Sequence, residues 1–599
     1  MSAEERRQSQ ADRIITYTLK QDVRLFTDQR GTPYIKAQMS EVYETRRLRT
    51  RAIRAWLAGL MWREEKKAPG SEALASALNV LEAQANEGSV MPLYNRVASD
   101  GLGGIYIDMA DTEWRAIHVT RDGWEISDTP PVLFRRYSHQ KPLPKPVRGG
   151  SVLPLLDFMN LKDEGERLLY LVAVVSSFIP DIPHPILVCY GPQGSGKTGC
   201  LKATRAVIDP SILGVLTLPR RQRELVQNLD HHYCAFYDNV GPIPTWISNV
   251  LCRAVTGTGV SNRQLYTDEE DVIFEYHRCC GLTDINIAAE RGDLLDRSIL
   301  LGFEYIPDEK RRTEKELDAL LGRRTPEILG GILDVLVKAL NLYPKVEIDK
   351  LFRMADFTRW GYAIAKAMGR DPEEFVEAYR KNIEMQSLEA IRASPLADVL
   401  VKFVELKTRG SWSGTASQLW TELEEMATGL KISTRQKAWP KNPKLLSRRL
   451  NELVPSLPAV GIEITKGYRG KSRIININVV GIDGIRGSTD DTDDTNNIRE
   501  SYSPNQRCIT DKADDKNGSH SGIAHSLQGH LDKLVGTLSD IQRYESQGPV
   551  TRLTLLERLE RDRTLDWDSP LFDKVLDIAI RDGRLYEPRP GFISVMEGA

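Results

Sequence analysis

A glycine-rich stretch carries the most specific chemistry in this sequence. It fits the pattern GxxxxGK followed by Ser or Thr, with Gly191, Pro192, Gln193, Gly194, Ser195, Gly196, Lys197 and Thr198. In such a stretch the glycines let backbone N–H groups face phosphate oxygens, the lysine neutralises phosphate charge and the hydroxyl ligates Mg²⁺. An apolar strand is expected over 185–190, and the helix expected after Thr198 favours an anion at its N-terminus. We therefore predict a phosphate-binding loop for ATP and Mg²⁺.

A second apolar run, residues 233–237, ends in Asp238, which lies 41 residues after Lys197. An ATPase places here the carboxylate that holds Mg²⁺ through water, together with the threonine of the loop. Taken alone, Asp238 could equally be a strand-end aspartate that caps a turn. Asn239 follows where an ATPase usually has glutamate. Either the Asn239 amide orients the attacking water, or hydrolysis is slow or tightly gated, and the sequence leaves both alternatives open.

The stretch that follows Asp238, down to the phrase DLLDRS, resembles the AAA+ ATPases. Within them it is similar to the superfamily 3 helicases of viruses and the related primase-helicases of phages and plasmids. The likeness covers roughly residues 20–480, and no primase-polymerase module is visible ahead of the ATPase. The resemblance implies that Asn286 is the sensor-1 residue at the end of a strand. It also implies that Arg297, in the DR element, reaches the nucleotide of a neighbouring subunit.

The same resemblance implies a ring, a homo-hexamer, whose channel holds single-stranded DNA. A hairpin over roughly 257–273 would line the channel, and Gly257, Arg263 and Tyr266 match its pattern. Arg263 would contact a phosphate and Tyr266 would stack on a base, both without sequence preference. Alternatively, Tyr266 packs inside the subunit and Arg263 contacts a phosphate of the neighbour's ATP.

Two more arginines have alternatives of their own. Arg291 is a second candidate for the arginine that acts between subunits, or it is a surface residue in a turn. Arg353 opens an amphipathic helix expected over 353–369, where it has a sensor-2 role or simply caps the helix.

A basic cluster near residue 450 predicts a winged-helix DNA-binding unit. The order is helix, basic helix and basic hairpin. The basic residues, which would contact duplex DNA through its phosphates, are Lys441, Lys444, Arg448, Arg449, Lys466, Arg469, Lys471 and Arg473. The alternative is an ordinary solvated charged face.

The whole chain of 599 residues is too long for one core. We expect an α/β fold: a P-loop AAA+ core of the superfamily 3 type at 151–308, after a mixed α+β domain at 1–150. A helical lid at 309–395, a winged helix at 396–480, a disordered linker at 481–525 and a second winged helix at 526–599 would follow. The last unit is similar to the C-terminal winged helix of archaeal minichromosome maintenance helicases. Its exposed Asp573 and Asp577 favour contact with a replication-protein partner over DNA.

Composition narrows the classes of function. The formal net charge is −2, so a nucleic-acid site must be a local basic patch. No apolar run is long enough to span a membrane, and the first residues lack the apolar core of a secretory signal. The 7 cysteines include no CxxC pair and the 9 histidines show no ligand spacing. We expect reduced thiols, a cytoplasmic location and no structural zinc.

The leading interpretation is an ATP-dependent, ring-forming DNA helicase or translocase that replicates a virus, plasmid or other mobile element. The alternative is an ATP-gated DNA-binding switch, such as an origin binder, a helicase loader or a regulator, that does not separate strands. A third alternative, an enzyme whose chemistry lies in residues 1–150, is disfavoured because no carboxylate cluster, Ser/His/Asp arrangement or metal spacing is visible there.

Overall fold

The chain forms two compact units, residues 1–487 and 488–599. The computed structural model describes residues 8–39, 41–257, 260–263, 271–274, 277–287, 291–349, 351–407, 411–436, 439–469 and 472–479, and separate positions between 533 and 595. The predicted linker 481–525 lies outside the described residues. Among the described residues, no helix is both long and apolar enough to cross a bilayer.

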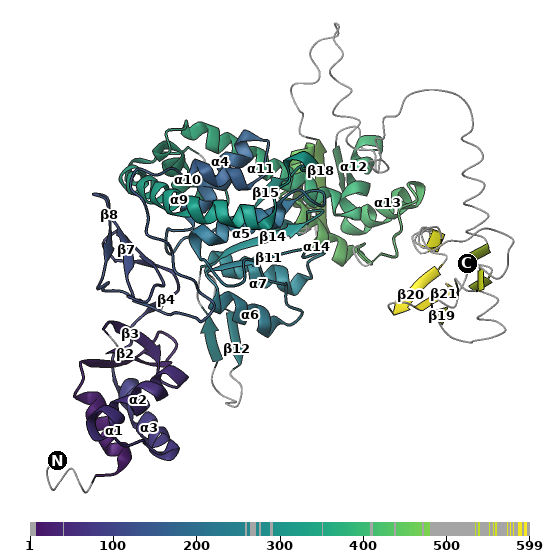
Figure 1. Cartoon of the computed structure of the whole chain (residues 1–599). Coiled ribbons are helices and arrows are strands. Elements are labelled where there is room, and N and C mark those ends of the chain that lie inside the picture. Colours follow the sequence, from purple (N-terminus) through teal and green to yellow (C-terminus); the bar gives the residue numbers. More distant parts are fainter. Residues whose placement is uncertain are drawn as a thin grey trace. The chain divides into compact units, whose positions relative to one another are not determined.

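A four-stranded parallel sheet forms the centre of the first unit (Figure 1). Its order is β11-β14-β10-β15, and the strands are β10 (Ile186–Tyr190), β11 (Cys234–Tyr237), β14 (Cys279–Asp284) and β15 (Ser298–Gly302). Two hydrophobic clusters contain residues of this sheet, one larger than the other. Successive residues of β10 belong to different clusters: Leu187 lies in the larger cluster and Val188 in the smaller one. A parallel sheet buried on both faces has such apolar strands. The α/β layer fold expected from the sequence is confirmed for this part of the chain.

Helices cover both faces of this sheet. Those in the larger cluster are α4 (Glu164–Ser176) and α5 (Lys197–Ile208), and those in the smaller one are α6 (Gln222–His231), α7 (Thr245–Thr256) and α8 (Gly292–Leu295). Residues 168–176 of α4 are all buried. A helix that is apolar all round must lie inside the protein, which explains the longest apolar run of the sequence.

The segment predicted as a helical lid, 309–395, packs into the larger cluster together with α4. Its helices are α9 (Glu314–Leu342), α10 (Ala355–Ala367) and α11 (Pro372–Arg392). The Asn382 side chain of α11 accepts a hydrogen bond from Leu300 N (3.0 Å) and donates one to Leu300 O (2.8 Å). This amide satisfies backbone groups that the outer strand β15 would otherwise leave unpaired.

Residues 8–150, predicted as one domain, contribute to several hydrophobic clusters. A cluster of their own is built by α1 (Gln10–Leu19), β1 (Val23–Thr27), β2 (Pro33–Gln38), α2 (Arg51–Glu65) and α3 (Ser71–Glu87), and β3 (Tyr43–Arg47) pairs with β2. The following strands are β4 (Leu93–Tyr94), β5 (Val97–Ser99), β6 (Ile105–Asp108), β7 (Ala116–Val119), β8 (Trp124–Ser127) and β9 (Leu133–Phe134). Val97, Ile107 and Ile117 of the antiparallel sheet β5–β8 enter the larger cluster of the central sheet. The sheet β5–β8 therefore shares the hydrophobic core of the central parallel sheet.

Residues 395–479 form three helices and a three-stranded antiparallel sheet with a core of their own. The elements are α12 (Pro395–Lys407), β16 (Ser411–Gly414), α13 (Ala416–Gly429), α14 (Pro443–Leu453), β17 (Ile462–Arg469) and β18 (Ser472–Val479), with the sheet order β16-β18-β17. Thr415 and Gln418 form a capping box that starts α13. The Asn442 side chain caps α14, with Pro443 at its first position.

The second unit is described at fewer positions. Its strands β19 (Val550–Thr551), β20 (Leu585–Arg589) and β21 (Phe592–Val595) pair in the order β19-β21-β20. Phe572, Val575, Leu576 and Ala579 are buried, at helical spacing.

Candidate nucleotide-binding site

The predicted phosphate loop connects β10 to α5 at the carboxyl edge of the central sheet. Gly194 and Gly196 have φ angles of 73° and 89°, in the left-handed region that favours glycine. A Cβ atom on Gly191 would lie 2.1 Å from Phe303 O, so this position also needs glycine. The first N–H groups of α5 have no partner inside the helix. The loop therefore combines close packing with backbone donors that have no partner inside α5.

Lys197 folds back on this loop. Its Nζ donates hydrogen bonds to Gly191 O (2.7 Å), Pro192 O (2.6 Å) and Ser195 Oγ (3.2 Å). Burial lowers the pKa of Lys197 from its usual value, against the opposing charges of Cys189, Asp238 and Asp284. The ammonium group thus lies at the loop, among carbonyl oxygens that phosphate oxygens would replace.

Asp238 lies beside Thr198, as the spacing of the two motifs led us to expect. Thr198 Oγ1 donates to Asp238 Oδ1 at 2.7 Å, and Thr283 Oγ1 donates to the same oxygen at 2.5 Å. Thr283 Oγ1 also accepts a hydrogen bond from Asn239 N at 2.9 Å. Thr283 was not singled out in the sequence, because nothing in the order of the chain shows that β14 lies directly beside β11.

Asn239 and Asn286 both lie at this edge. Asn239 is exposed and has a φ of 51°, a left-handed conformation that asparagine tolerates better than glutamate. β14 ends at Asp284, and Ile285 O accepts a hydrogen bond from Gly191 N (3.1 Å). Asn286 is the next residue and is exposed beside the loop. The roles of Asn239 and Asn286 stay predictions.

The residues at this edge fit a nucleoside triphosphate with Mg²⁺. Thr198 and Asp238 offer hydroxyl and carboxylate oxygens, the ligands that Mg²⁺ prefers. Lys197 and the N-terminus of α5 supply positive charge for phosphates. In the described part of the chain, no group of three or more His, Cys, Asp or Glu side chains could hold a metal ion.

An arginine that the sequence analysis did not single out also lies beside the loop. Arg311 Nη2 would be 3.2 Å from a Cβ atom on Gly194, and it donates to Tyr305 OH at 2.8 Å. Ile306 contacts the same loop, since its Cδ1 would be 3.2 Å from a Cβ atom on Gly196. The pair Arg311 and Arg312 after an apolar strand could have indicated a basic residue for phosphates. The sequence does not show, however, that the segment after β15 folds back to the loop.

Arg297 lies at the opposite edge of the sheet. It directly precedes β15, whose last residue, Gly302, pairs in register with Tyr190 at the start of the loop. The length of β15 separates the two edges by about 16 Å. Arg297 Nη1 donates to Asp293 O at 2.6 Å. Arg297 therefore cannot reach the nucleotide site of its own chain.

Arg291 and Arg353 lie near Arg297. Arg291 pairs with Asp293 at 3.1 Å, and Arg353 pairs with Asp296. All four of these paired residues line one groove together with Arg448 and Arg449 of α14. Arg353 is thus distant from the loop in its own chain.

The basic residues of the predicted winged helix take different places. Lys444, Arg448 and Arg469 are exposed, whereas Arg449 pairs with Glu452 (2.7 Å). Lys441 Nζ donates to Thr434 O (2.8 Å), and Lys466 Nζ donates to Asn451.

The hairpin β17–β18 carries an aromatic residue that the sequence analysis missed. Tyr468 is 67% exposed, and Arg473 Nε donates to its hydroxyl at 3.0 Å. Lys471 lies outside the described residues, as do Tyr266 and the side chain of Arg263. The backbone of β12 (Val260–Arg263) pairs antiparallel with β13 (Asp271–Phe274), as expected for a hairpin there.

Comparison with protein families finds a likeness to the replication proteins of mobile elements. Residues 150–386 match the family described as actinomycete integrative conjugative element replication protein. Residues 396–490 match the C-terminal domain of the RepA protein of that family. The two matches together cover more than half of the chain, which therefore resembles such a replication protein over both segments. No curated protein matches the chain.

Several solved structures resemble the chain weakly. The apo C-terminal region of NrS-1 is 12–13% identical, with 78–79% of this chain and 98–100% of that chain covered and TM-scores of 0.32–0.34. A JCV helicase structure is 15% identical over 36% of this chain and 65% of that chain, with a TM-score of 0.20.

Proposed function

We propose that this protein is an ATP-dependent DNA helicase or translocase that acts in the replication of a mobile element. The observation that carries the proposal is the cluster of Lys197, Thr198 and Asp238 at one edge of the sheet, with hydrogen bonds of 2.5–2.7 Å to Asp238. The family matches support the role in replication.

The proposed site would act as follows. The loop and Lys197 would bind the phosphates, and Thr198 and Asp238 would hold a magnesium ion, which neutralises charge on the phosphates when bound. Asn239, held through its backbone by Thr283, presents its amide to an attacking water. Arg297 of one chain completes the site of the next chain, which makes a ring, a homo-hexamer, the functional assembly.

The test is steady-state ATP hydrolysis with and without single-stranded DNA. Lys197→Ala should abolish nucleotide binding and hydrolysis, because no other side chain of the loop supplies its charge. Lys202→Ala is the matched control, since this lysine lies on the same helix and pairs with the exposed Glu314 (2.9 Å). Hydrolysis that survives in Lys197→Ala would refute the proposed site.

We also propose that residues 395–479 bind duplex DNA as a winged helix, with α14 and the β17–β18 hairpin at the phosphates. Substituting Lys444 and Arg469 together by alanine should weaken duplex binding and lower its salt slope by about 2. Lys402→Ala, on α12, is the control. An unchanged salt slope would mean that these charges only face solvent.

The second candidate is an ATP-gated DNA-binding switch. It is favoured by Asn239, which provides no carboxylate to activate water. Unwinding of a forked duplex distinguishes the two functions: a helicase separates the strands, and a switch binds DNA in the presence of ATP without separating them.

A further inference from the structure

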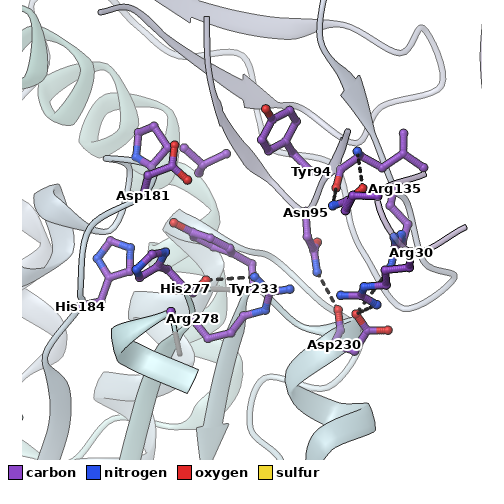
Figure 2. Close-up of a pocket in the computed structure, with 15 residues that line it drawn as sticks. Arg30, Tyr94, Asn95, Arg135, Asp181, His184, Asp230, Tyr233, His277 and Arg278 are labelled. Carbon is purple, nitrogen blue, oxygen red and sulfur yellow. Dashed lines mark hydrogen bonds and ion pairs between the residues drawn. The ribbon is translucent and has the colours of Figure 1, made fainter. Parts of the chain in front are cut away.

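A second cavity, of about 310 Å³, lies away from the nucleotide site (Figure 2). Residues from four parts of the chain line it. They are residues 29, 30, 93–95, 97 and 135 of the N-terminal part, residues 180, 181 and 184 before β10, residue 230 of α6 and residue 233 before β11, and residues 257, 277 and 278, which flank the β12–β13 hairpin. Its size is that of a site for one small ligand. The cavity therefore joins the N-terminal part to the hairpin that the sequence predicts to contact DNA.

The charges of this cavity favour an anion. Its charged residues are three arginines and two aspartates. Asp230 pairs with Arg30 at 2.6 Å and with Arg135 at 3.5 Å. Arg278 Nε donates to Leu229 O at 2.6 Å, which holds its guanidinium group at the wall. One positive charge is in excess, which suits a single phosphodiester group.

His184 is a buried polar side chain without a partner in this cavity. It is 1% exposed, and neither of its ring nitrogens has a hydrogen-bond partner. Burial lowers the pKa of His184 to about 3, so its ring is neutral at pH 7 and offers one donor and one acceptor. Leaving such a group unsatisfied costs about 1–3 kcal/mol. A ligand with hydrogen-bonding groups of both kinds would remove this cost.

Aromatic rings and the ends of the hairpin complete the cavity. Tyr233 meets His184 edge to face at a centroid distance of 6.4 Å, and Tyr94 forms part of the opposite wall. Gly257, with a φ of 73°, allows His277 to approach so closely that a Cβ atom would lie 2.4 Å from His277 Nε2. Gly257 and His277 flank the β12–β13 hairpin. A ligand in this cavity would therefore contact the residues that connect the hairpin to the rest of the chain.

We propose that this cavity binds one nucleotide unit: a phosphate near the arginines, a base against Tyr94, and a hydrogen-bonding edge at His184. The inference rests on the proposed function, in which single-stranded DNA passes the hairpin. The same chemistry is presented by a free mononucleotide, and the experiment separates the two sources.

The experiment measures binding of the full-length protein to a fluorescent 20-nucleotide dT strand, with dTMP as competitor. His184→Leu should weaken binding of the strand by about tenfold or more without loss of thermal stability, because the substitution removes an unsatisfied buried group. Tyr94→Ala, on a half-buried wall, should also weaken it by about tenfold. His118→Leu, a half-buried histidine of β7, is the control and should bind as the unchanged protein does.

The outcomes separate this inference from the proposed function. If dTMP competes with the strand and both substitutions weaken this competition, the ligand is a free nucleotide. If the substitutions weaken only the binding of the strand, the ligand is the DNA strand. Normal binding of both probes in His184→Leu and Tyr94→Ala would overturn the cavity as a nucleotide site, even with ATP hydrolysis intact. Absence of ATP and DNA binding in the unchanged protein would instead overturn the proposed function, and the inference with it.

Discussion

Thr283 is the residue that connects the two halves of the predicted catalytic edge. Its hydroxyl donates to Asp238 and accepts from the backbone of Asn239. A second hydrogen bond of this kind orients a ligating carboxylate, and its loss costs about 10–100-fold in metal affinity or activity.

We therefore expect Thr283→Val to lower ATP turnover by about 10–100-fold and to raise the Mg²⁺ concentration that is required. Thr283→Ser keeps the hydroxyl and should retain most of the activity. The measurement is a magnesium titration of steady-state hydrolysis. Equal magnesium dependence in Thr283→Val and the unchanged protein would mean that this hydroxyl only packs the strand end.

The sequence predicted some residues of this site and not others, for physical reasons. Lys197 and Thr198 follow a strand directly in the chain, and an acid at the end of a second apolar run belongs at the same edge of a parallel sheet. Thr283 and Arg311 reach the site only through tertiary structure: one through the neighbouring position of β14, the other through a segment that folds back after β15. The hydrophobic periodicity of the sequence therefore could not identify Thr283 or Arg311 as residues of the site.

At the scale of elements, a cluster of histidines lies where the N-terminal part meets α6 and β11. The ring centroids of His139 and His232 are 3.9 Å apart, and Arg205 Nη2 lies 2.7 Å from His232 Nδ1. Since arginine can only donate, His232 Nδ1 must accept and the ring must be neutral. Burial, followed by the charge of Arg205, lowers the pKa of His232 to about 3.

This cluster makes stability depend on pH. Between the unfolded pKa of about 6.5 and the folded pKa, only the unfolded chain takes up the proton, so the free energy of unfolding falls as pH falls. His232 alone should remove about 2 kcal/mol between about pH 6.5 and pH 5. Denaturant unfolding at both pH values measures this change in the free energy of unfolding. In His232→Gln the free energy of unfolding should depend less on pH, and the same pH dependence as in the unchanged protein would exclude His232 as the cause.

The helical segments show the other limit of prediction from sequence. The sequence predicted a helical segment at 309–395 with an amphipathic helix over 353–369, and the structure has helices α9 to α11 there. The pattern could not show that Asn382 would pair with both backbone groups of Leu300, or that these helices would share the core of α4. An amphipathic face defines what a helix buries and leaves its partner undefined.

At the scale of the whole molecule, the proposed site needs two chains, because the phosphate loop and Arg297 lie at opposite edges of the sheet. Arg297→Ala should leave nucleotide binding intact and lower turnover by about 10³-fold or more. Mixing this variant with Lys197→Ala before assembly should restore part of the activity, because one chain then supplies the loop and the other the arginine. The measurement is hydrolysis by the mixture against each variant alone.

The mixing experiment also has an outcome that contradicts the assignment. If Arg297→Ala is inactive and mixing restores nothing, the arginine serves its own chain, through the hydrogen bond to Asp293 O (2.6 Å). If Arg297→Ala alone keeps full turnover, no arginine at this position takes part in hydrolysis.

Arg96 and Asp209 form a buried ion pair of 2.8 Å, in which the Arg96 side chain is 0% and the Asp209 side chain 1% exposed. This ion pair determines where the chain can be truncated. The family match begins at residue 150, which invites expression of a shortened chain from there. Such a fragment would lack Arg96, and the carboxylate of Asp209 would lose this ion-pair partner. It would also uncover the apolar side chains that now pack against β5–β8. We expect poor solubility from that fragment, and a cut after residue 487 to be the safer choice.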